Sequence, residues 1–468
     1  MNKIKQFRKL GGVESFFYWR SKDHHCANFR VGAQYSKEIK VESIYKALSH
    51  MCYKYNALAT NVFNDGILDR TGAGTLQLMD KFKLKDVLTV VDDPKENCET
   101  QIDRVHNYYF PYGGSEPLWK IVLINKKQVL FYCDHVPFDG TAATNFHKIL
   151  METLNNIEKT ETKNEFIGME SIVYDSSKVI GDNHLPPSPS EILDSTVPVS
   201  RHAYELALHN LPLSLSKWVR HWFSDNKYAH LMDYIPRKVP PPGVDDRPAW
   251  LHLSPEKVKK LLKLCRDNNT KITALLSVIS MLSAKDFIAG HDNRLCWPVN
   301  LRDRIDTEKA SNLCSNYTPE FGLYIGFVFA ELPPVEKIFP NGKIDWEVVK
   351  YVHDTIHNNA IRSYDTMSLF DTYNSRVYLE GMYGAIEKGD SNPLVYFLSN
   401  IGNVKAEAKE GEIEIERVWF DQEADGTIIW MNVCSAKQGM TISMRTHLPE
   451  WREMLRSGME KHLNALIA

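Results

Sequence analysis

Residues 118–154 read LWKIVLINKKQVLFYCDHVPFDGTAATNFHKILMETL. The runs at 118–124 and 128–133 are rich in β-branched and aromatic residues, which predicts two strands joined by a short turn at 125–127. After Gly140 the apolar residues recur every three or four positions, which predicts a helix. The segment DHVPFDG, residues 134–140, therefore lies at a strand-to-helix junction, where its side chains can point into a cleft.

The pattern His-x-x-x-Asp-Gly in this segment consists of His135, Asp139 and Gly140. An imidazole has an unperturbed pKa near ~6.5, so it can take a proton from an attacking nucleophile at neutral pH. Asp139 can hold the loop by pairing with a distant cation, and Gly140 lets the backbone turn sharply or lets a substrate approach closely. In a chain with 17 histidines, chance yields only ~0.04 such patterns. The motif alone leaves a second interpretation open, a buried histidine beside a structural aspartate.

The rest of the chain alternates predicted helices and strands. Helices are predicted at 41–55, 203–223, 272–284 and 450–466 and from 255 onward, and strands at 249–253, 294–299, 322–329, 394–398, 413–420, 428–434 and 440–445. Stretches rich in Pro and Ser at 184–198 and in Pro at 240–243 break regular structure and predict a connection between two halves. We therefore expect an N-terminal half at 1–165, a crossover region at 166–248 and a C-terminal half at 249–468.

The length, composition and charge of the chain exclude some classes of protein. The chain has 468 residues, 43% of them hydrophobic, which is too long for one ordinary core. Its formal net charge of -3, without a long single-sign block, argues against a nucleic-acid partner. The 8 cysteines form no Cys-x-x-Cys pair, as expected for reduced thiols inside the cell, and no metal-ligand spacing appears. No signal peptide is evident, and the longest apolar run, 323–330, is too short to span a bilayer.

Four segments, in this order, carry a resemblance to a known family. They are RKLGGVE at 8–14, DHVPFDG at 134–140, WPVNLR at 297–302 and SNIG at 399–402. Together they resemble the chloramphenicol-acetyltransferase-like superfamily of CoA-dependent acyltransferases, and within it the yeast alcohol acetyltransferase branch. Two departures favour that branch. Asp134 stands where peptide-synthetase condensation domains carry a second histidine, and VWFD at 418–421 stands near the place of the plant enzymes' DFGWG segment.

The resemblance implies an α/β fold of two chloramphenicol-acetyltransferase-like halves with a tunnel at their interface. His135 would lie in the middle of the tunnel, with acetyl-CoA as the cosubstrate entering from one face and the acceptor from the other. His135 would deprotonate the acceptor, which attacks the thioester directly, without a covalent enzyme intermediate and without a metal. Asp139 would point away from the substrate and pair with Arg302, for which a solvated strand-end charge is the alternative.

Four further residues have two interpretations each. Ser399 and Asn400 would line the tunnel or assist the oxyanion, whereas the alternative for both is an ordinary turn. Trp419 and Trp430 are interpreted as core residues rather than as a platform for the substrate.

The acceptor that the resemblance implies is a hydrophobic long-chain amine. The opening residues and the length are similar to those of members that N-acetylate a sphingosine-like drug, myriocin, and so confer resistance by detoxification. An alcohol acceptor, giving an acetate ester, stays open because one general base serves either nucleophile. A non-catalytic protein that binds acyl-CoA or lipid is the third interpretation, and the intact motif argues against it.

The N-terminus bears on where the protein acts. Ile4, Phe7 and Leu10, with the early lysines, form a weak amphipathic patch that suits peripheral contact with a membrane. The alternative, that both termini dock on the protein body, is favoured. We expect an intracellular monomer, in the cytosol or peripherally on the endoplasmic reticulum.

Overall fold

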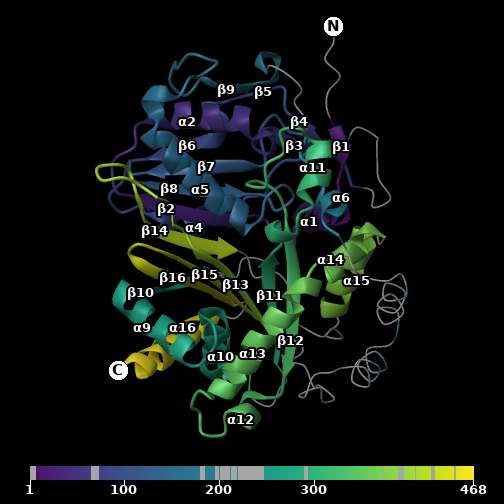
Figure 1. Cartoon of the computed structure of the whole chain (residues 1–468), viewed down its shortest axis with the longest axis vertical. Coiled ribbons are helices and arrows are strands. Elements are labelled where there is room, and N and C mark those ends of the chain that lie inside the picture. The colour runs from purple at the N-terminus through teal and green to yellow at the C-terminus, as the bar shows by residue number, and fades with distance from the viewer. Residues whose placement is uncertain are drawn as a thin grey trace.

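The structure is a computed structural model that describes residues 7–64, 73–179, 185–194, 247–288, 293–372, 374–387, 395–405, 407–422, 427–446 and 449–468, with residues 200, 211, 215 and 219. Its elements form a mixed α/β fold of two halves, one above the other in Figure 1. The predicted helix at 203–223 lies outside the described residues.

A five-stranded sheet organises the upper half. Its order is β14 (Ile415–Gln422), β2 (Phe29–Tyr35), β8 (Gln128–Cys133), β7 (Trp119–Ile124) and β6 (Leu88–Val91). The predicted hairpin of β7 and β8 is confirmed, and its turn has positive φ at Asn125 and Lys126, the conformation that matches the twist of a tight hairpin. The helices α2 (Val41–Lys54) and α5 (Gly140–Asn155) pack together over this sheet and complete its core.

A six-stranded sheet organises the lower half. Its order is β10 (Ala249–Leu253), β16 (Gly439–Thr446), β15 (Ile429–Ala436), β13 (Tyr396–Asn403), β11 (Asn293–Asn300) and β12 (Ile325–Leu332). One face is covered by α9 (Pro255–Asp267), α10 (Ile272–Ala284), α13 (Trp346–Asn359) and α16 (Pro449–Ile467), in front of the sheet in Figure 1. Helix α9 begins as predicted, with Pro255 in its first turn and the Ser254 hydroxyl accepting from Lys257 N.

The two halves share a strand and a buried ion network. Strand β14 lies in sequence between β13 and β15 of the lower sheet but pairs antiparallel with β2 of the upper sheet, as Figure 1 shows. On β14, the fully buried Asp421 accepts from Arg30 of β2 at 3.1 Å and from Arg445 of β16 at 2.7 Å. Breaking one partner of such a buried pair leaves an uncompensated charge, so this network holds the halves together. The predicted boundaries at 165 and 248 stay predictions.

Smaller elements complete the described chain. The short strands are β1 (Phe7–Lys9), β3 (Thr60–Phe63) and β4 (Thr75–Leu78) in one sheet and β5 (Lys81–Lys83) and β9 (Ile172–Asp175) in another. The remaining α-helices are α1 (Gly12–Lys22), α3 (Leu84–Val87), α4 (Cys98–Val105), α6 (Pro189–Ile192), α11 (Thr307–Leu313), α12 (Val335–Ile338), α14 (Asp365–Ser368) and α15 (Ser375–Glu387). Among the described helices, none is both long and apolar enough to cross a bilayer.

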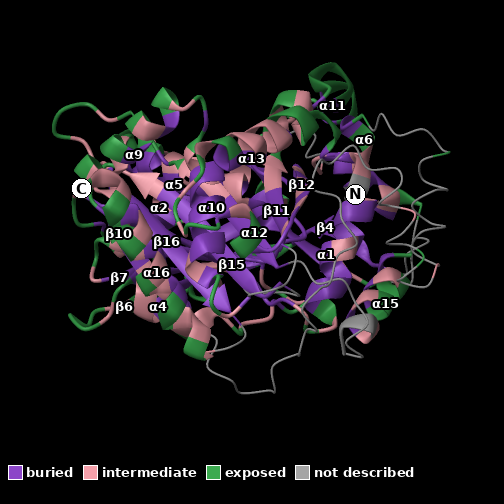
Figure 2. Ribbon diagram, turned by 90° about the horizontal axis from the view of Figure 1, so that it is seen from below, coloured by how far each residue is buried: buried purple, intermediate pink, exposed green. Residues whose placement is uncertain are grey.

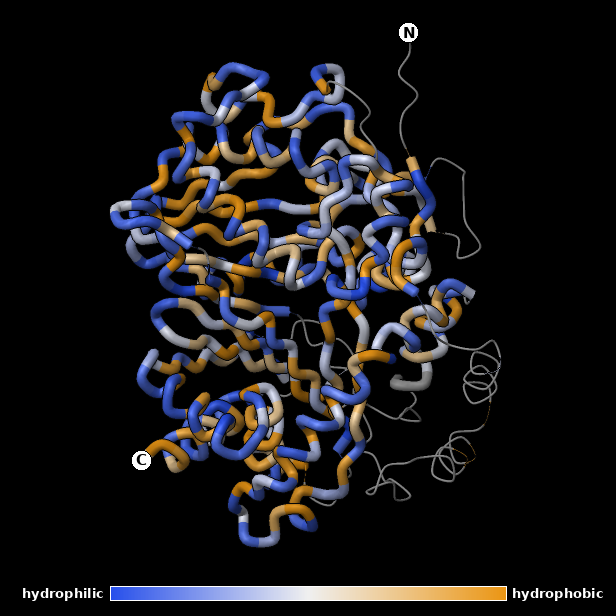
Figure 3. The backbone as a smooth tube through the Cα atoms, in the orientation of Figure 1, coloured by the Kyte–Doolittle hydropathy of each residue, from blue (hydrophilic) through white to orange (hydrophobic). Residues whose placement is uncertain are grey.

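Burial follows the predicted periodicity. The predicted helices near 41–55, 272–284 and 450–466 and the strands of the lower sheet are confirmed within a few residues. Figure 2 shows the strands buried inside and the outer helices exposed on one side, and Figure 3 shows hydrophobic segments concentrated in the strands. The strand predicted at 322–329 begins only at Ile325, because Gly322 and Tyr324 bond to Asp139 instead. At the N-terminus, Phe7 lies exposed in β1 and Leu10 is buried.

Candidate active site

The turn after β8 presents His135. Asp134, the first residue past the strand, donates its backbone N–H to Leu118 O at 2.9 Å, which continues the hairpin by one residue. Its carboxylate Oδ1 accepts from Val136 N at 2.8 Å, a local bond that closes the turn over His135. The predicted strand-to-helix junction is therefore a tight turn fixed by the side chain of Asp134.

The imidazole of His135 is held in one tautomer. Its Nδ1 lies 3.0 Å from Phe138 O. A carbonyl oxygen only accepts, so Nδ1 carries the hydrogen and Nε2 keeps its lone pair. Among the described residues, no side chain or backbone group bonds to Nε2. The residue is 8% exposed, so a small part of its surface remains accessible. This is the arrangement that a general base requires.

Two phenylalanines fix the plane of the ring. The ring of Phe17 on α1 stacks on His135 with centroids 4.5 Å apart and planes at 22°. The ring of Phe29 on β2 lies 4.4 Å away at 34°. Neither residue, nor the helix that carries Phe17, is predicted from the sequence. The one available signal was the aromatic run FFYW at 16–19.

Burial keeps the His135 ring neutral. Burial, together with the smaller effect of the positive charge of Arg20 on α1, lowers the pKa of His135 to about 3. The guanidinium of Arg20 lies over the Phe17 ring, 4.7 Å from its centroid, and donates to Cys26 Sγ at 3.1 Å. The lone pair of Nε2 is therefore available throughout the physiological pH range.

Asp134 is part of a buried polar group next to His135. Its Oδ2 accepts from the Tyr112 hydroxyl at 2.9 Å. Burial raises the pKa of Asp134 to about 6, against the opposing effects of bonds from Val136 N, Tyr112 and Ser21 and of the Arg20 charge. At neutral pH a carboxylate and a guanidinium thus lie together next to the imidazole.

Asp139 caps α5 and joins the two halves. Its Oδ1 accepts from Ala142 N at 2.8 Å, which satisfies a free N–H at the start of the helix. Its Oδ2 accepts from Arg302 Nη1 and from Tyr324 N, both at 2.8 Å. The predicted contact between Asp139 and Arg302 is therefore present. With the carboxylate 1% exposed and bonded on both oxygens, Asp139 is engaged in holding structure.

Arg302 has further bonds that fix it in place. Its Nε donates to Pro319 O at 2.7 Å, and its Nη1 donates to Asn300 Oδ1 at 3.1 Å. It also stands over the Tyr324 ring at 5.1 Å. The alternative interpretation, a solvated strand-end charge, does not fit this set of contacts.

Gly140 is explained by a neighbour from the other half. A Cβ at position 140 would lie 2.7 Å from Ile401 Cγ2, closer than real side chains approach. Its φ is not in the left-handed region, so a sharp turn is not what requires glycine here. Strand β13 therefore ends against the first residue of α5.

Ser399 and Asn400 point to opposite faces of β13. Asn400 Nδ2 donates to Thr273 Oγ1 of α10 at 3.0 Å, and its Oδ1 accepts from Gly402 N at 2.9 Å. Its amide thus serves the helix-covered face and the local turn, away from the motif. Ser399 is buried and, by strand alternation, points away from the helix-covered face. Ile401, past a register shift between Asn400 and Asn403, also lies on that side and packs against the upper core. Of the two predicted residues, only Ser399 lies on the same face as the contact with Gly140.

The segment RKLGGVE anchors α1. The Arg8 guanidinium donates two bonds of 2.7 Å to the carboxylate of Glu14, which also accepts from Gly11 N at 2.8 Å. A Cβ at Gly12 would lie 2.2 Å from the backbone of Phe370, so only glycine fits there. These contacts fix the helix that carries Phe17 and Arg20 to His135.

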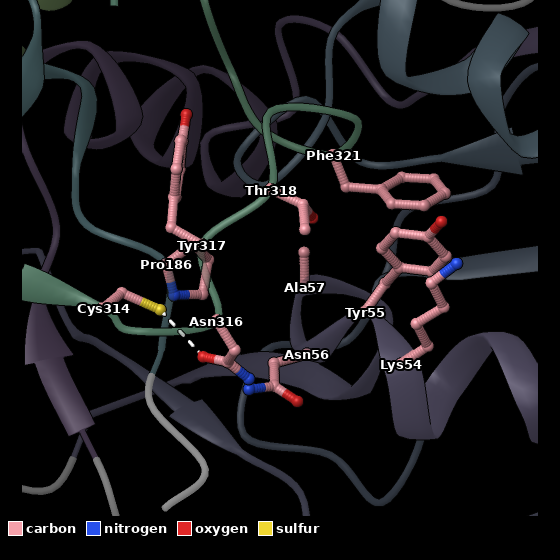
Figure 4. Close-up of a pocket in the computed structure, with 10 residues that line it drawn as sticks. All are labelled: Lys54, Tyr55, Asn56, Ala57, Pro186, Cys314, Asn316, Tyr317, Thr318 and Phe321. Carbon is pink, nitrogen blue, oxygen red and sulfur yellow. Dashed lines mark hydrogen bonds between the residues drawn. The ribbon is translucent and has the colours of Figure 1, made fainter. Parts of the chain in front are cut away.

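A small cavity lies behind the motif, at the end of α2. It measures about 20 Å³, room for a single water molecule. Figure 4 shows Tyr55 and Phe321 on one side and the Cys314–Asn316 bond on the other. Phe321, which lines the cavity, packs against Tyr55 at 5.1 Å and against Phe138 of the motif at 6.2 Å, but His135, Asp139 and Gly140 are not among the lining residues. It does not belong to the site of His135.

Trp419 and Trp430 are both buried. Trp419 on β14 donates Nε1–H to Glu99 at 2.9 Å and is buried in a large core cluster. Trp430 on β15 is 3% exposed and belongs to a separate small cluster.

Within the described ranges no group of His, Cys, Asp and Glu side chains could hold a metal ion.

Comparison with known proteins gives the family. The sequence profile of the alcohol acetyltransferase family matches residues 9–72 and 85–457. The chain is similar to N-acetyltransferase SLI1 of Saccharomyces cerevisiae, with 24% identity over 423 residues that cover 84% of each chain.

Solved structures show the same fold. TRI3 trichothecene 15-O-acetyltransferase from Fusarium sporotrichioides matches with a TM-score of 0.63 and 10% identity, over 99% of this chain and 95% of that one. The condensation domain of the Monacolin K polyketide synthase MokA matches with a TM-score of 0.59 and 12% identity, over 99% and 97%. With the profile spanning both halves and the whole motif, the chain belongs to the alcohol acetyltransferase family and is an acyltransferase.

Proposed function

We propose that this acyltransferase is an acetyl-CoA-dependent N-acetyltransferase that acts on a hydrophobic long-chain amine, sphingoid-like, such as myriocin. The observation that carries the proposal is the free lone pair of His135 Nε2 in a buried neutral ring. The similarity of the whole chain to N-acetyltransferase SLI1 favours an amine as the acceptor. Acetylation of a bioactive amine would detoxify it.

The proposed reaction has one general base. The acceptor nitrogen attacks the carbonyl carbon of the acetyl thioester, and His135 Nε2 takes a proton from that nitrogen. The carbon–sulfur bond then breaks, and the protonated Nε2 returns its proton to the departing thiolate. The products are an N-acetyl amide and free CoA. The hydrogen bond from Nδ1–H to Phe138 O keeps the ring oriented and stabilises the transient imidazolium.

Other residues would act by position. Asp139 and Arg302 hold the start of α5, and with it the turn that presents His135. Ser399, on the face of β13 that meets Gly140, is the proposed donor to the tetrahedral oxyanion. Asn400 has its amide engaged by Thr273 and Gly402, so its proposed role is to shape the strand end.

A second candidate function is an alcohol O-acetyltransferase. The family is described by alcohol acetylation, and Nε2 accepts a hydroxyl proton as readily as an amine proton. The chemistry at His135 is the same for both, so the acceptor alone separates them.

An acceptor panel tests the proposal. Purified protein with acetyl-CoA is given sphingoid amines and medium-chain alcohols, and thiol release and product mass are followed. We expect turnover of long-chain amines that is lost in His135→Ala and retained in His147→Gln, a variant at a second buried histidine. Acetylation of alcohols alone would replace the first function by the second. Absence of turnover with any acceptor would overturn both.

The setting of the reaction is also proposed. We expect a monomer that takes a hydrophobic small molecule, in the cytosol or attached peripherally to the endoplasmic reticulum. Sedimentation of the protein with and without vesicles tests both points.

A further inference from the structure

The two faces of the six-stranded sheet carry different side chains. Tyr396 and Leu398 of β13 point to the helix-covered core. Phe397, between them, points to the opposite face. There it belongs to a cluster called here the aromatic face, which consists of Cys296, Phe327, Phe329, Phe397 and Trp430. Phe327 also packs against the core cluster that contains Phe17, whereas the other four residues belong to none of the three main cores of the described chain.

The aromatic face is a rigid apolar surface. Phe397 stacks on Trp430 with centroids 4.0 Å apart and planes at 22°, and Phe327 lies 6.0 Å from Phe397. Trp430 Nε1–H donates to Asn432 Oδ1 at 3.0 Å, so the indole has no free donor. Phe327 and Phe329 remain partly exposed, although a fold gains by burying such rings. The other three residues, Cys296, Phe397 and Trp430, are at most 8% exposed, so these two rings form the accessible part of the aromatic face. Apolar surface that a fold leaves accessible commonly marks a binding site.

Two strands connect the aromatic face to the motif. Along β13 the residues Phe397 and Ser399 share one face. Past a register shift between Asn400 and Asn403, Ile401 packs against the upper core and meets Gly140 at the start of α5. Phe397 and Ile401 are four residues apart, which is about 13 Å of strand. Strand β11 runs in parallel from Cys296 to Asn300, which binds Arg302. The aromatic face therefore lies about 13 Å along β13 from the contact with Gly140, on the side of the sheet that meets the motif.

The charges at its edge indicate what it binds. Arg294 stands over Phe329 at 5.1 Å and lies 3.9 Å from Glu331, so the guanidinium faces a carboxylate. A polyphosphate such as the nucleotide part of CoA requires unpaired cations, which the aromatic face does not offer. Flat apolar rings without a free donor suit a hydrocarbon chain.

We infer that the aromatic face binds the alkyl chain of the acceptor, with the acceptor's reacting end at His135; this inference rests on the proposed function. Each methylene buried there contributes roughly a fourfold gain in binding. The face thus makes the enzyme select long-chain acceptors over short ones.

The test compares short and long members of one homologous series of primary amines, each below its micelle concentration. For the wild-type protein, kcat/KM rises with chain length. Phe327→Ala is expected to lose about ten-fold in kcat/KM for the longest amine and little for the shortest, through KM, since about two methylenes lose their contact. Phe327→Leu retains an apolar surface and gives an intermediate loss.

The matched control is Phe287→Ala. Phe287 is also partly buried against an aromatic partner, Trp451 at 4.6 Å, but on the helix-covered side. This variant should keep the wild-type dependence on chain length. Thermal unfolding of all three variants checks that they are folded.

Two outcomes overturn the inference. One is an equal loss for short and long amines in Phe327→Ala. The other is a changed dependence on the acyl chain of the acyl-CoA instead of the acceptor, which would assign the face to the donor. If the wild-type protein acetylates only alcohols, the proposed function fails and an alcohol series decides the inference. If it acetylates nothing, calorimetric binding of the longest amine to the wild-type protein and to Phe327→Ala decides it.

Discussion

Two buried histidines of the same strand–turn–helix unit differ in their hydrogen bonds. His135 lies in the turn before α5, and His147 lies within α5. Each gives one ring N–H to a backbone carbonyl: His135 Nδ1 to Phe138 O at 3.0 Å and His147 Nε2 to Val31 O at 2.9 Å. Burial lowers both pKa values, to about 3 and about 4. By these measures the two are alike.

They differ at the second nitrogen. His147 Nδ1 accepts from the Tyr35 hydroxyl at 2.9 Å, so both of its nitrogens are used and the side chain is 0% exposed. Nε2 of His135 has no partner in the described part of the chain. Burial and a lowered pKa therefore do not distinguish the two histidines, whereas the available lone pair of His135 does.

Replacing each histidine tests the comparison most severely. His135→Gln should lower kcat by about a thousandfold, because a general base contributes roughly 10²–10⁴ in rate. His147→Gln should leave kcat within about threefold. Steady-state thiol release from acetyl-CoA measures both. Similar losses in the two variants would show that the second nitrogen is not what distinguishes them.

Removing the bond from Arg302 to Asp139, which holds the start of α5, should give the next largest effect. Arg302→Met should lower the free energy of unfolding by about 1.5–3 kcal/mol, because Asp139 loses a charge-assisted bond while its backbone donors remain. A double-mutant cycle with Asp139→Asn, measured by urea unfolding, should give a coupling of at least about 0.5 kcal/mol. A coupling of zero would remove the pair from the account of how His135 is held.

Replacing His147 should lower the free energy of unfolding. His147→Phe leaves the Tyr35 hydroxyl and Val31 O without their partner, which should cost about 1–3 kcal/mol of unfolding free energy. The pH dependence has a definite sign. Because the folded-state pKa is about 4 and the unfolded value is 6.5, the unfolded chain binds more protons between these pH values.

His147 therefore stabilises the fold fully above pH 6.5 and loses that contribution as the pH falls toward 4. The variant should show a shallower decline in urea-derived stability over this window. Asp134, whose pKa is raised, acts in the opposite direction but is present in both proteins, so it cancels in the difference. An unchanged slope would contradict the lowered pKa of His147.

The smallest effect is expected from replacing Arg20, whose positive charge lowers the pKa of His135 but is not a cause of the lowered pKa of His147. Arg20→Met should raise the pKa of His135 while leaving it below 6.5, since burial is the larger cause. Arg20→Lys keeps the charge and is the control. Ring-nitrogen NMR shifts during an acid titration report His135 directly, and the carboxylate of Asp134 is the other charge beside it. A downward shift in Arg20→Met would reverse the assigned sign.

The sequence predicts what local pattern encodes. The β7–β8 hairpin, α5 and the His135–Asp139–Gly140 spacing are contiguous, and Arg302 follows from the resemblance of one further segment. Helix α1 is not predicted from the sequence because nine of its 11 residues are buried, so it has no apolar stripe against a polar face. The rings of Phe17 and Phe29 reach His135 from more than a hundred residues away, and no local pattern specifies such contacts.

Other features depend on the sheets themselves. A strand pattern predicted β14 but could not say which sheet it joins. The direction of Asn400 toward α10 follows from the register of β13, which a single strand pattern leaves undetermined by one residue. The need for Gly140 comes from Ile401, on a strand that the sequence places far away.

Strand β14 has a consequence for how the chain acquires its structure. Arg30 and Asp421 are 391 residues apart, so β2 stands at the edge of its sheet until almost the whole chain has left the ribosome. Contacts across such separations close slowly, and an unpaired edge strand invites association with other chains. Truncation before residue 415 would leave that edge permanently unpaired. Until β14 pairs with β2, a newly made chain is therefore exposed to aggregation through this edge.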